Sequence, residues 1–131
     1  TLEEVWGNGA EAYFGITVSG FPNIFMMYGH NTNLAGSIIY MLESESRYIL
    51  RCLRKLQQRK AIYMTVRSEA QEQINAELQE RISKTVIMDD NCFSYFKNAS
   101  GKVTTQWPGY LLEYRLRTTR VKNGDYEFAY A

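Results

Sequence analysis

The chain has 131 residues, 45 % of them hydrophobic and 22 % charged, which is the size and composition of one folded domain. Its 15 Lys and Arg residues against 14 Asp and Glu give a net charge of +1, which argues against a strongly basic nucleic-acid-binding protein and against an acidic disordered tail. The uncharged stretch at residues 15–28 contains Pro22 and Asn23 and falls short of the roughly 20 apolar residues of a membrane span. We therefore expect a folded chain with neither a nucleic-acid partner nor a membrane span.

The two cysteines and the first residue indicate the setting of the chain. Cys52 and Cys92 form neither a disulfide framework nor a CxxC metal motif, so we expect two reduced thiols and a cytoplasmic protein. The chain begins at Thr1, without an initiator Met or a signal segment. We expect it to be a piece of something longer.

The first predicted elements form a strand, a loop and a helix. Residues 24–28 are a continuous apolar run, typical of a strand buried on both faces. Residues 29–36 are rich in Gly and Asn, which favours a loop. A helix is predicted from Ser37, its N-cap, to Arg59, with an apolar stripe at helical spacing made of Ile38, Leu42, Ile49, Leu53 and Leu56.

The second half of the chain predicts shorter elements. Residues 61–66 alternate as a short strand, and a helix follows with Ser68 as its N-cap and with one apolar face made of Ala70, Ile74, Leu78 and Ile82. Residues 93–107 are predicted to form a hairpin around the turn formers 98–101. Residues 110–121 fit a strand and a helix equally well.

Several motifs that are often catalytic or ligand-binding do not support such a role here. Residues 7–12 match G-x-G-x-x-A, but no buried strand precedes them, so we interpret them as a surface loop. His30 is the one histidine of the sequence, which excludes a histidine-based metal cluster or a Ser–His–Asp set within it. We predict no catalytic residue and no metal site. A basic cluster near the C-terminus is either a solvated face or a phosphate contact, and it consists of Arg115, Arg117, Arg120 and Lys122.

The loop at residues 29–36 is the strongest candidate for ligand contact. A buried strand that ends in a Gly/Asn loop and leads into a helix N-terminus can accept an anion or a dipole. From the residues alone, an ordinary turn between a strand and a helix remains the alternative.

Four stretches of the chain, in order, resemble the C-terminal part of flavin-containing monooxygenases of the Baeyer–Villiger type. The first is residues 15–34, with the sequence GITVSGFPNIFMMYGHNTNL, and the second is residues 37–48 (SIIYMLESESRY). The third is residues 67–81, and the fourth runs from Ser94 through Trp107 to Tyr126. The resemblance covers nearly the whole chain. His30 stands where this family usually has Pro, and Tyr95 where it usually has Trp.

The resemblance implies an α+β fold, built from the C-terminal βα unit of a Rossmann-type FAD-binding domain, a further helix, a hairpin and a short terminal element. Residues 1–60 would be the last part of the FAD domain, and residues 61–131 a helix-and-hairpin cap. It also implies an enzyme that uses FAD and NADPH to insert oxygen next to a carbonyl or into a heteroatom. The residues it places against FAD are Asn31, Thr32, Asn33, Leu34, Ser37 and Ile38, and those it places near NADP are Ser94 and Tyr95.

Two expectations follow for the chain by itself. Both phosphate-binding glycine motifs of this family lie outside it, so we expect no bound cofactor and no activity, with the remainder of its own chain as partner. The exposed strand edges and the apolar stripe of the helix predict self-association through residues 21–56. The alternative is a freestanding, non-catalytic α+β interaction module.

Overall fold

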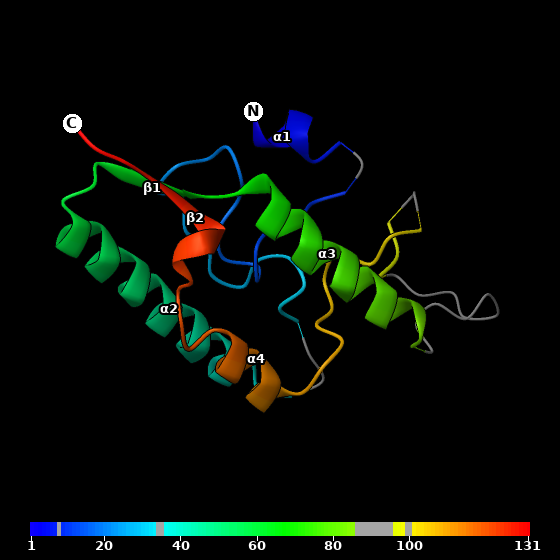
Figure 1. Cartoon of the computed structure of the whole chain (residues 1–131). Coiled ribbons are helices and arrows are strands. Elements are labelled where there is room, and N and C mark those ends of the chain that lie inside the picture. Colours follow the sequence, from blue (N-terminus) through cyan, green and yellow to red (C-terminus); the bar gives the residue numbers. More distant parts are fainter. Residues whose placement is uncertain (8, 34–35, 86–95, 99–100) are drawn as a thin grey trace.

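The computed structural model of the chain describes residues 1–7, 9–33, 36–85, 96–98 and 101–131 (Figure 1). The described part is an α+β fold with a two-stranded sheet. In chain order its elements are α1 (Leu2–Val5), α2 (Ile38–Arg59), β1 (Tyr63–Val66), α3 (Ser68–Ser83), α4 (Leu111–Arg117), a short 3₁₀ helix (Asn123–Asp125) and β2 (Tyr126–Ala129). Within these ranges no helix is both long and apolar enough to cross a membrane.

Helix α2 begins and ends where the sequence predicts. The Ser37 hydroxyl accepts a hydrogen bond from the backbone N–H of Tyr40 at 3.3 Å, which caps the first turn, and Lys60 ends the helix in the left-handed conformation at φ 53°. The buried face of α2 consists of Met41, Ser44, Glu45, Tyr48 and Cys52. The predicted apolar stripe therefore lies beside this face, and its member Leu53 is 46 % exposed.

The prediction of a buried strand at residues 24–28 is wrong for this chain. The segment is not a strand, and its Ile24, Met27 and Tyr28 side chains are exposed. Its nearest backbone neighbour is a loop, because the Met26 N–H donates to the Ile16 carbonyl at 2.8 Å. A strand buried on both faces needs neighbouring strands and a covering layer on each side, and the described part of the chain supplies neither there.

The short strand and the second helix are confirmed. Strand β1 lies within the predicted residues 61–66 and pairs antiparallel with β2, in a register that joins Tyr63 to Ala129 and Val66 to Tyr126. Helix α3 begins at Ser68, with Arg67 rather than Ser68 at the N-cap position. Its predicted apolar face packs inward, since Leu78 and Ile82 are fully buried.

The structure also decides the two remaining C-terminal predictions. The residues on either side of the predicted turn pair with each other, because the Asn98 N–H donates to the Lys102 carbonyl at 2.9 Å and Lys97 bridges antiparallel to Val103. Residues 99–100 of the turn lie outside the described residues. Much of its first arm, residues 93–95, lies outside the described residues. Of the two readings of residues 110–121 the helix is correct, since α4 occupies Leu111–Arg117.

One core joins the N-terminal loop to every longer element. Figure 1 shows α2 and α3 on either side of the loop segments, with the β1–β2 sheet at one end. The two predicted parts, residues 1–60 and 61–131, meet in this core, and the boundary between them stays a prediction. The core residues include Tyr13, Phe14, Ile16, Met41, Tyr48, Met64, Val66, Leu78, Trp107, Tyr114 and Tyr126.

Candidate functional site: a cavity beside the Gly/Asn loop

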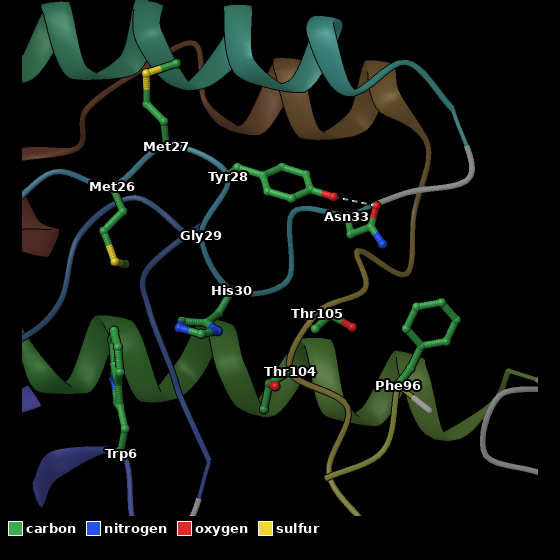
Figure 2. A pocket seen from close by; sticks show the side chains of 10 residues that line it. All are labelled: Trp6, Met26, Met27, Tyr28, Gly29, His30, Asn33, Phe96, Thr104 and Thr105. Carbon is green, nitrogen blue, oxygen red and sulfur yellow. Dashed lines mark hydrogen bonds between the residues drawn. The ribbon is translucent and has the colours of Figure 1, made fainter. Parts of the chain in front are cut away.

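The loop that the sequence singled out lies against a cavity of about 650 Å³ (Figure 2). Its walls come from the N-terminal segment, from residues 26–33, from Phe96 and from residues 104–105. The lining residues are Trp6, Met26, Met27, Tyr28, Gly29, His30, Asn33, Phe96, Thr104 and Thr105.

Two glycines allow the loop to cross the N-terminal segment at close range. A Cβ atom on Gly29 would lie 2.0 Å from the Gly15 carbonyl oxygen, and one on Gly15 would lie 2.2 Å from Cγ2 of Thr32. Both distances are far below van der Waals contact, so any side chain would push the two segments apart. The cavity wall depends on this close backbone approach.

Asn31 and Thr32 hold the loop from the inside. The buried Asn31 amide donates to the carbonyls of Val103 at 3.2 Å and Gln106 at 2.8 Å. The buried Thr32 hydroxyl donates to the Gly29 carbonyl at 2.7 Å. Both side chains are therefore used within the protein, and the structure gives them a role in positioning the loop.

Among the predicted site residues that the structure describes, Asn33 reaches the cavity. Its backbone N–H donates to the Thr105 carbonyl at 2.9 Å, and its carbonyl accepts the Trp107 N–H at 2.7 Å. Its side-chain oxygen accepts a hydrogen bond from the Tyr28 hydroxyl at 3.2 Å, as Figure 2 shows. The backbone and the side-chain amide of Asn33 are thus both fixed at the cavity wall by hydrogen bonds.

The other predicted site residues are not gathered in this cavity. Ser37 and Ile38 are exposed at the N-terminal end of α2 and do not line it. Leu34, Ser94 and Tyr95 lie outside the described residues. Phe96, which directly follows Ser94 and Tyr95 in the sequence, does line the cavity.

Several lining residues were not predicted. Tyr28 directly precedes the predicted loop and His30 lies within it, so their position in the sequence was a signal, whereas Trp6 is brought to the cavity by the fold alone. The His30 ring contacts the Trp6 ring edge-on, at 4.8 Å between centroids. Burial lowers the pKa of His30, so its imidazole is neutral at neutral pH.

A buried carboxyl group supports the loop from α2. Oε2 of Glu45 accepts the backbone N–H of Tyr28 at 2.7 Å. Burial raises the pKa of Glu45, against the opposing effect of the Tyr28 N–H and of the neighbouring Thr32 and Tyr114 side chains. Tyr28 needs this support because its φ of 56° lies in the left-handed region, which bulky residues rarely adopt.

Of the remaining sequence candidates, Cys52 and Arg117 have structural roles. Burial raises the pKa of the Cys52 thiol to about 12, so it is not a reactive thiolate, and Cys92 lies outside the described residues. Within the basic cluster, Arg117 pairs with both carboxylate oxygens of Glu77 at 2.6 and 2.7 Å. No group of three His, Cys, Asp or Glu residues in the described part of the chain is placed to hold a metal ion.

The cavity has the chemistry of a binding wall. Aromatic and thioether side chains form most of its surface, and the Asn33 amide and the Thr104 and Thr105 residues add hydrogen-bonding groups. Such a surface suits a flat ring that presents polar atoms along one edge. The His30 imidazole is neutral, and the Oδ1 atom of Asn33 already accepts a hydrogen bond from Tyr28. The wall is therefore equipped to bind and orient such a ring.

Comparison with curated proteins finds similarity to one class of enzyme. The chain is 40 % identical over 131 residues to a Baeyer–Villiger monooxygenase of Streptomyces coelicolor, covering 97 % of this chain and 25 % of that protein. It is 36 % identical over 119 residues to a Baeyer–Villiger monooxygenase of Pseudomonas aeruginosa, covering 89 % and 23 %. It is 34 % identical over 131 residues to the FAD-binding monooxygenase ktnD of Aspergillus niger, covering 96 % and 22 %.

Solved structures show the same fold. A steroid monooxygenase bound to NADP matches the whole chain and 25 % of its own, with a TM-score of 0.86 and 21 % identity. OTEMO in complex with FAD and NADP matches 98 % of the chain and 24 % of its own, with a TM-score of 0.81 and 20 % identity. No protein-family model matches the chain. The chain spans about a quarter of the length of the curated relatives it matches.

Proposed function

From the premise that this chain is homologous to Baeyer–Villiger and FAD-binding monooxygenases over 22–25 % of their length, we propose that it is one portion of an FAD- and NADPH-dependent monooxygenase. Its role there is to form one wall of the flavin site. The cavity beside residues 28–33 is the observation that carries this proposal, because the loop that resembles the flavin-facing loop of the family lines it.

The residues at the cavity fit a flavin ring. Asn33 offers an amide that its backbone and the Tyr28 hydroxyl hold in place, and Trp6 and Phe96 offer flat apolar faces. Bound flavin would supply the redox chemistry with NADPH and oxygen. This chain would orient the ring and exclude water from one side of it.

The start of α2 is proposed as a second contact with the flavin. The first backbone N–H groups of a helix carry partial positive charge, and Ser37 and Ile38 begin a helix of 22 residues. Such groups would stabilise the negative charge that reduction places on the flavin ring. By the same resemblance, Ser94 and Tyr95 are proposed to lie near NADP.

The isolated chain should be inactive, since it lacks the phosphate-binding glycine motifs of the family. Purified chain mixed with FAD and NADPH, then desalted, should retain no flavin absorbance and should not oxidise NADPH. The Streptomyces coelicolor relative, treated identically, is the control. A yellow chain that holds flavin after desalting would contradict the proposal that this segment depends on the rest of an enzyme.

The alternative is a freestanding α+β interaction module, favoured only by the fact that the chain forms one core of its own. The sequence encoded upstream of Thr1 distinguishes the enzyme proposal from this alternative. Two G-x-G-x-x-G units, each after a strand, support the enzyme, and a start codon directly before Thr1 supports the module.

We also propose that the enzyme is cytoplasmic. The free, buried thiol of Cys52 supports this location.

A further inference from the structure

The Glu45 carboxyl group is completely buried, and one of its two oxygens has no partner. Glu45 is 0 % exposed on the inner face of α2. Oε2 accepts the Tyr28 N–H, whereas Oε1 makes no hydrogen bond to any described residue. An ionised carboxylate left this way in the interior is strongly unfavourable, because both oxygens share the charge and both need donors.

The hydroxyl groups beside the carboxyl have already used their protons. Thr32 and Tyr114 are the side chains that interact with Glu45. The Thr32 hydroxyl donates to the Gly29 carbonyl, and the Tyr114 hydroxyl donates to the Phe14 carbonyl, both at 2.7 Å. A hydroxyl has one proton and a carbonyl has none, so neither hydroxyl has a proton left to donate to the Glu45 carboxyl group.

We propose that Glu45 is held as a neutral carboxylic acid and is a positioning residue for the cavity wall. Its carbonyl oxygen, Oε2, accepts the Tyr28 N–H. Its O–H group, at Oε1, donates to the Thr32 or the Tyr114 hydroxyl oxygen. The protonated group thus joins α2 to the cavity loop and, through Tyr114, to α4, and every polar atom in the cluster has a partner.

The surrounding charges leave the acid without a compensating cation. On the same helix as Glu45, the half-exposed side chains of Glu43 and Arg47 pair with each other, with 3.7 Å between Oε2 of Glu43 and Nη2 of Arg47. On α4, Arg115 stacks over the Tyr40 ring at 5.0 Å, and Tyr114 is itself kept protonated because burial raises its pKa well above its usual value. From the cavity loop, Tyr28 contributes its N–H and Thr32 its hydroxyl. None of the ion pairs found among the described residues includes Glu45.

The loop that Glu45 holds contains two residues with an unfavourable backbone conformation. Tyr28 and Asn31 both adopt left-handed conformations, at φ 56° and 57°, and such residues persist only when the surroundings enforce them. Loss of the Glu45 proton would place a charge between lone pairs at this point. The wall formed by Tyr28, Gly29 and Asn33 would then loosen.

A titration of the carboxyl carbon tests the state of the acid directly. In the chain labelled with ¹³C-glutamate, the Glu45 side-chain carboxyl resonance is identified by its absence in Glu45→Gln. It should keep the chemical shift of a protonated acid at neutral pH, and it should be unchanged in Glu43→Gln, which replaces a half-exposed glutamate of the same helix. A Glu45 resonance with the chemical shift of an ionised carboxylate at neutral pH would overturn the proposal.

The stability of the two variants gives a second readout. A folded pKa above the unfolded one means that the native state holds the extra proton, so wild-type stability should fall relative to Glu45→Gln as pH rises from about 5 to about 9. Glu43→Gln should follow the wild type throughout. A pH-independent difference between wild type and Glu45→Gln would contradict the proposal. Should Glu45→Gln fail to fold, through-bond correlations assign the same resonance in the wild type and the titration still decides.

Both readouts use the chain without flavin. Failure of the Glu45 proposal is therefore distinguishable from failure of the proposed enzyme function.

Discussion

Gly29 is the residue on which the geometry of the cavity wall depends most directly. Replacement by Ala would place its Cβ 2.0 Å from the Gly15 carbonyl oxygen, which is backbone and has no rotamer to move away. We expect Gly29→Ala to lower the free energy of unfolding by about 1–3 kcal/mol or more, measured by urea denaturation.

Gly124 provides the matched control for that substitution. A Cβ atom there meets nothing within 4 Å, so Gly124→Ala should change stability by no more than about 0.5 kcal/mol. Equal unfolding midpoints for the two variants would show that the crossing of residues 15 and 29 is not tight.

At single residues, the sequence located the candidate loop but not the role of each side chain. Its composition marked residues 29–36 as a ligand-facing loop, and Asn33 does line the cavity. Asn31 and Thr32 turn inward because the carbonyls of Val103, Gln106 and Gly29 need donors. Those acceptors come partly from a segment over 70 residues away, so local pattern does not reveal them.

At the scale of elements, α3 and α4 are joined by two bidentate ion pairs. Arg117 binds Glu77, and Arg81 binds Glu113 at 2.6 and 2.9 Å. Hydrogen bonding from Arg117 lowers the pKa of Glu77, and hydrogen bonding from Arg81 lowers that of Glu113. All four side chains are partly exposed, so solvent screens these pairs.

The acid dependence of stability tests these pairs. A lowered folded pKa contributes stability that is present above the ordinary value of about 4.3 and is lost as pH falls through the folded value. The double variant Glu77→Gln/Glu113→Gln should lose about 1 kcal/mol near neutral pH, and its difference from wild type should shrink at about pH 3 in urea denaturation.

The control for the ion pairs is Glu80→Gln. Glu80 pairs with Lys84 on the same helix, and both side chains are 70 % exposed, so its loss should have little effect at any pH. A double variant that behaves like Glu80→Gln would show that the α3–α4 ion pairs do not contribute to stability.

Elements whose signals are local could be predicted, and those that need a distant partner could not. The cap at Ser37 and the long periodic pattern fixed α2 within a residue. Residues 24–28 have the composition of a buried strand, but a strand requires a neighbour, and the Ile16 loop offers one backbone bond. The partner of β1 is β2, about 60 residues later, which no local pattern indicates.

At the scale of the whole molecule, apolar side chains remain exposed along residues 21–56. Ile39 is 70 % exposed, Met27 50 % and Leu53 46 %. We expect the chain to self-associate through this surface, and sedimentation at micromolar concentration should show a dimer or a larger species. A monomer that unfolds in one cooperative thermal transition would contradict the predicted self-association, because these side chains would then be stably exposed to solvent.

A pair of charge substitutions locates the surface. Ile39→Glu should shift the sedimenting species toward monomer, because it places a charge within the apolar contact. Leu112→Glu lies on α4 outside this range, at a site that is 61 % exposed, and should leave the association unchanged. Equal effects of the two substitutions would contradict association through residues 21–56.

The central claim is that this chain forms one wall of a monooxygenase flavin site. The most direct measurement is the FAD content of a chimera in which the chain replaces the matching segment of the Streptomyces coelicolor relative, to which it is 40 % identical. The account predicts a yellow chimera that retains as much FAD after gel filtration as the parent enzyme measured beside it. A chimera with the circular dichroism and elution volume of the parent, but without flavin, would contradict it.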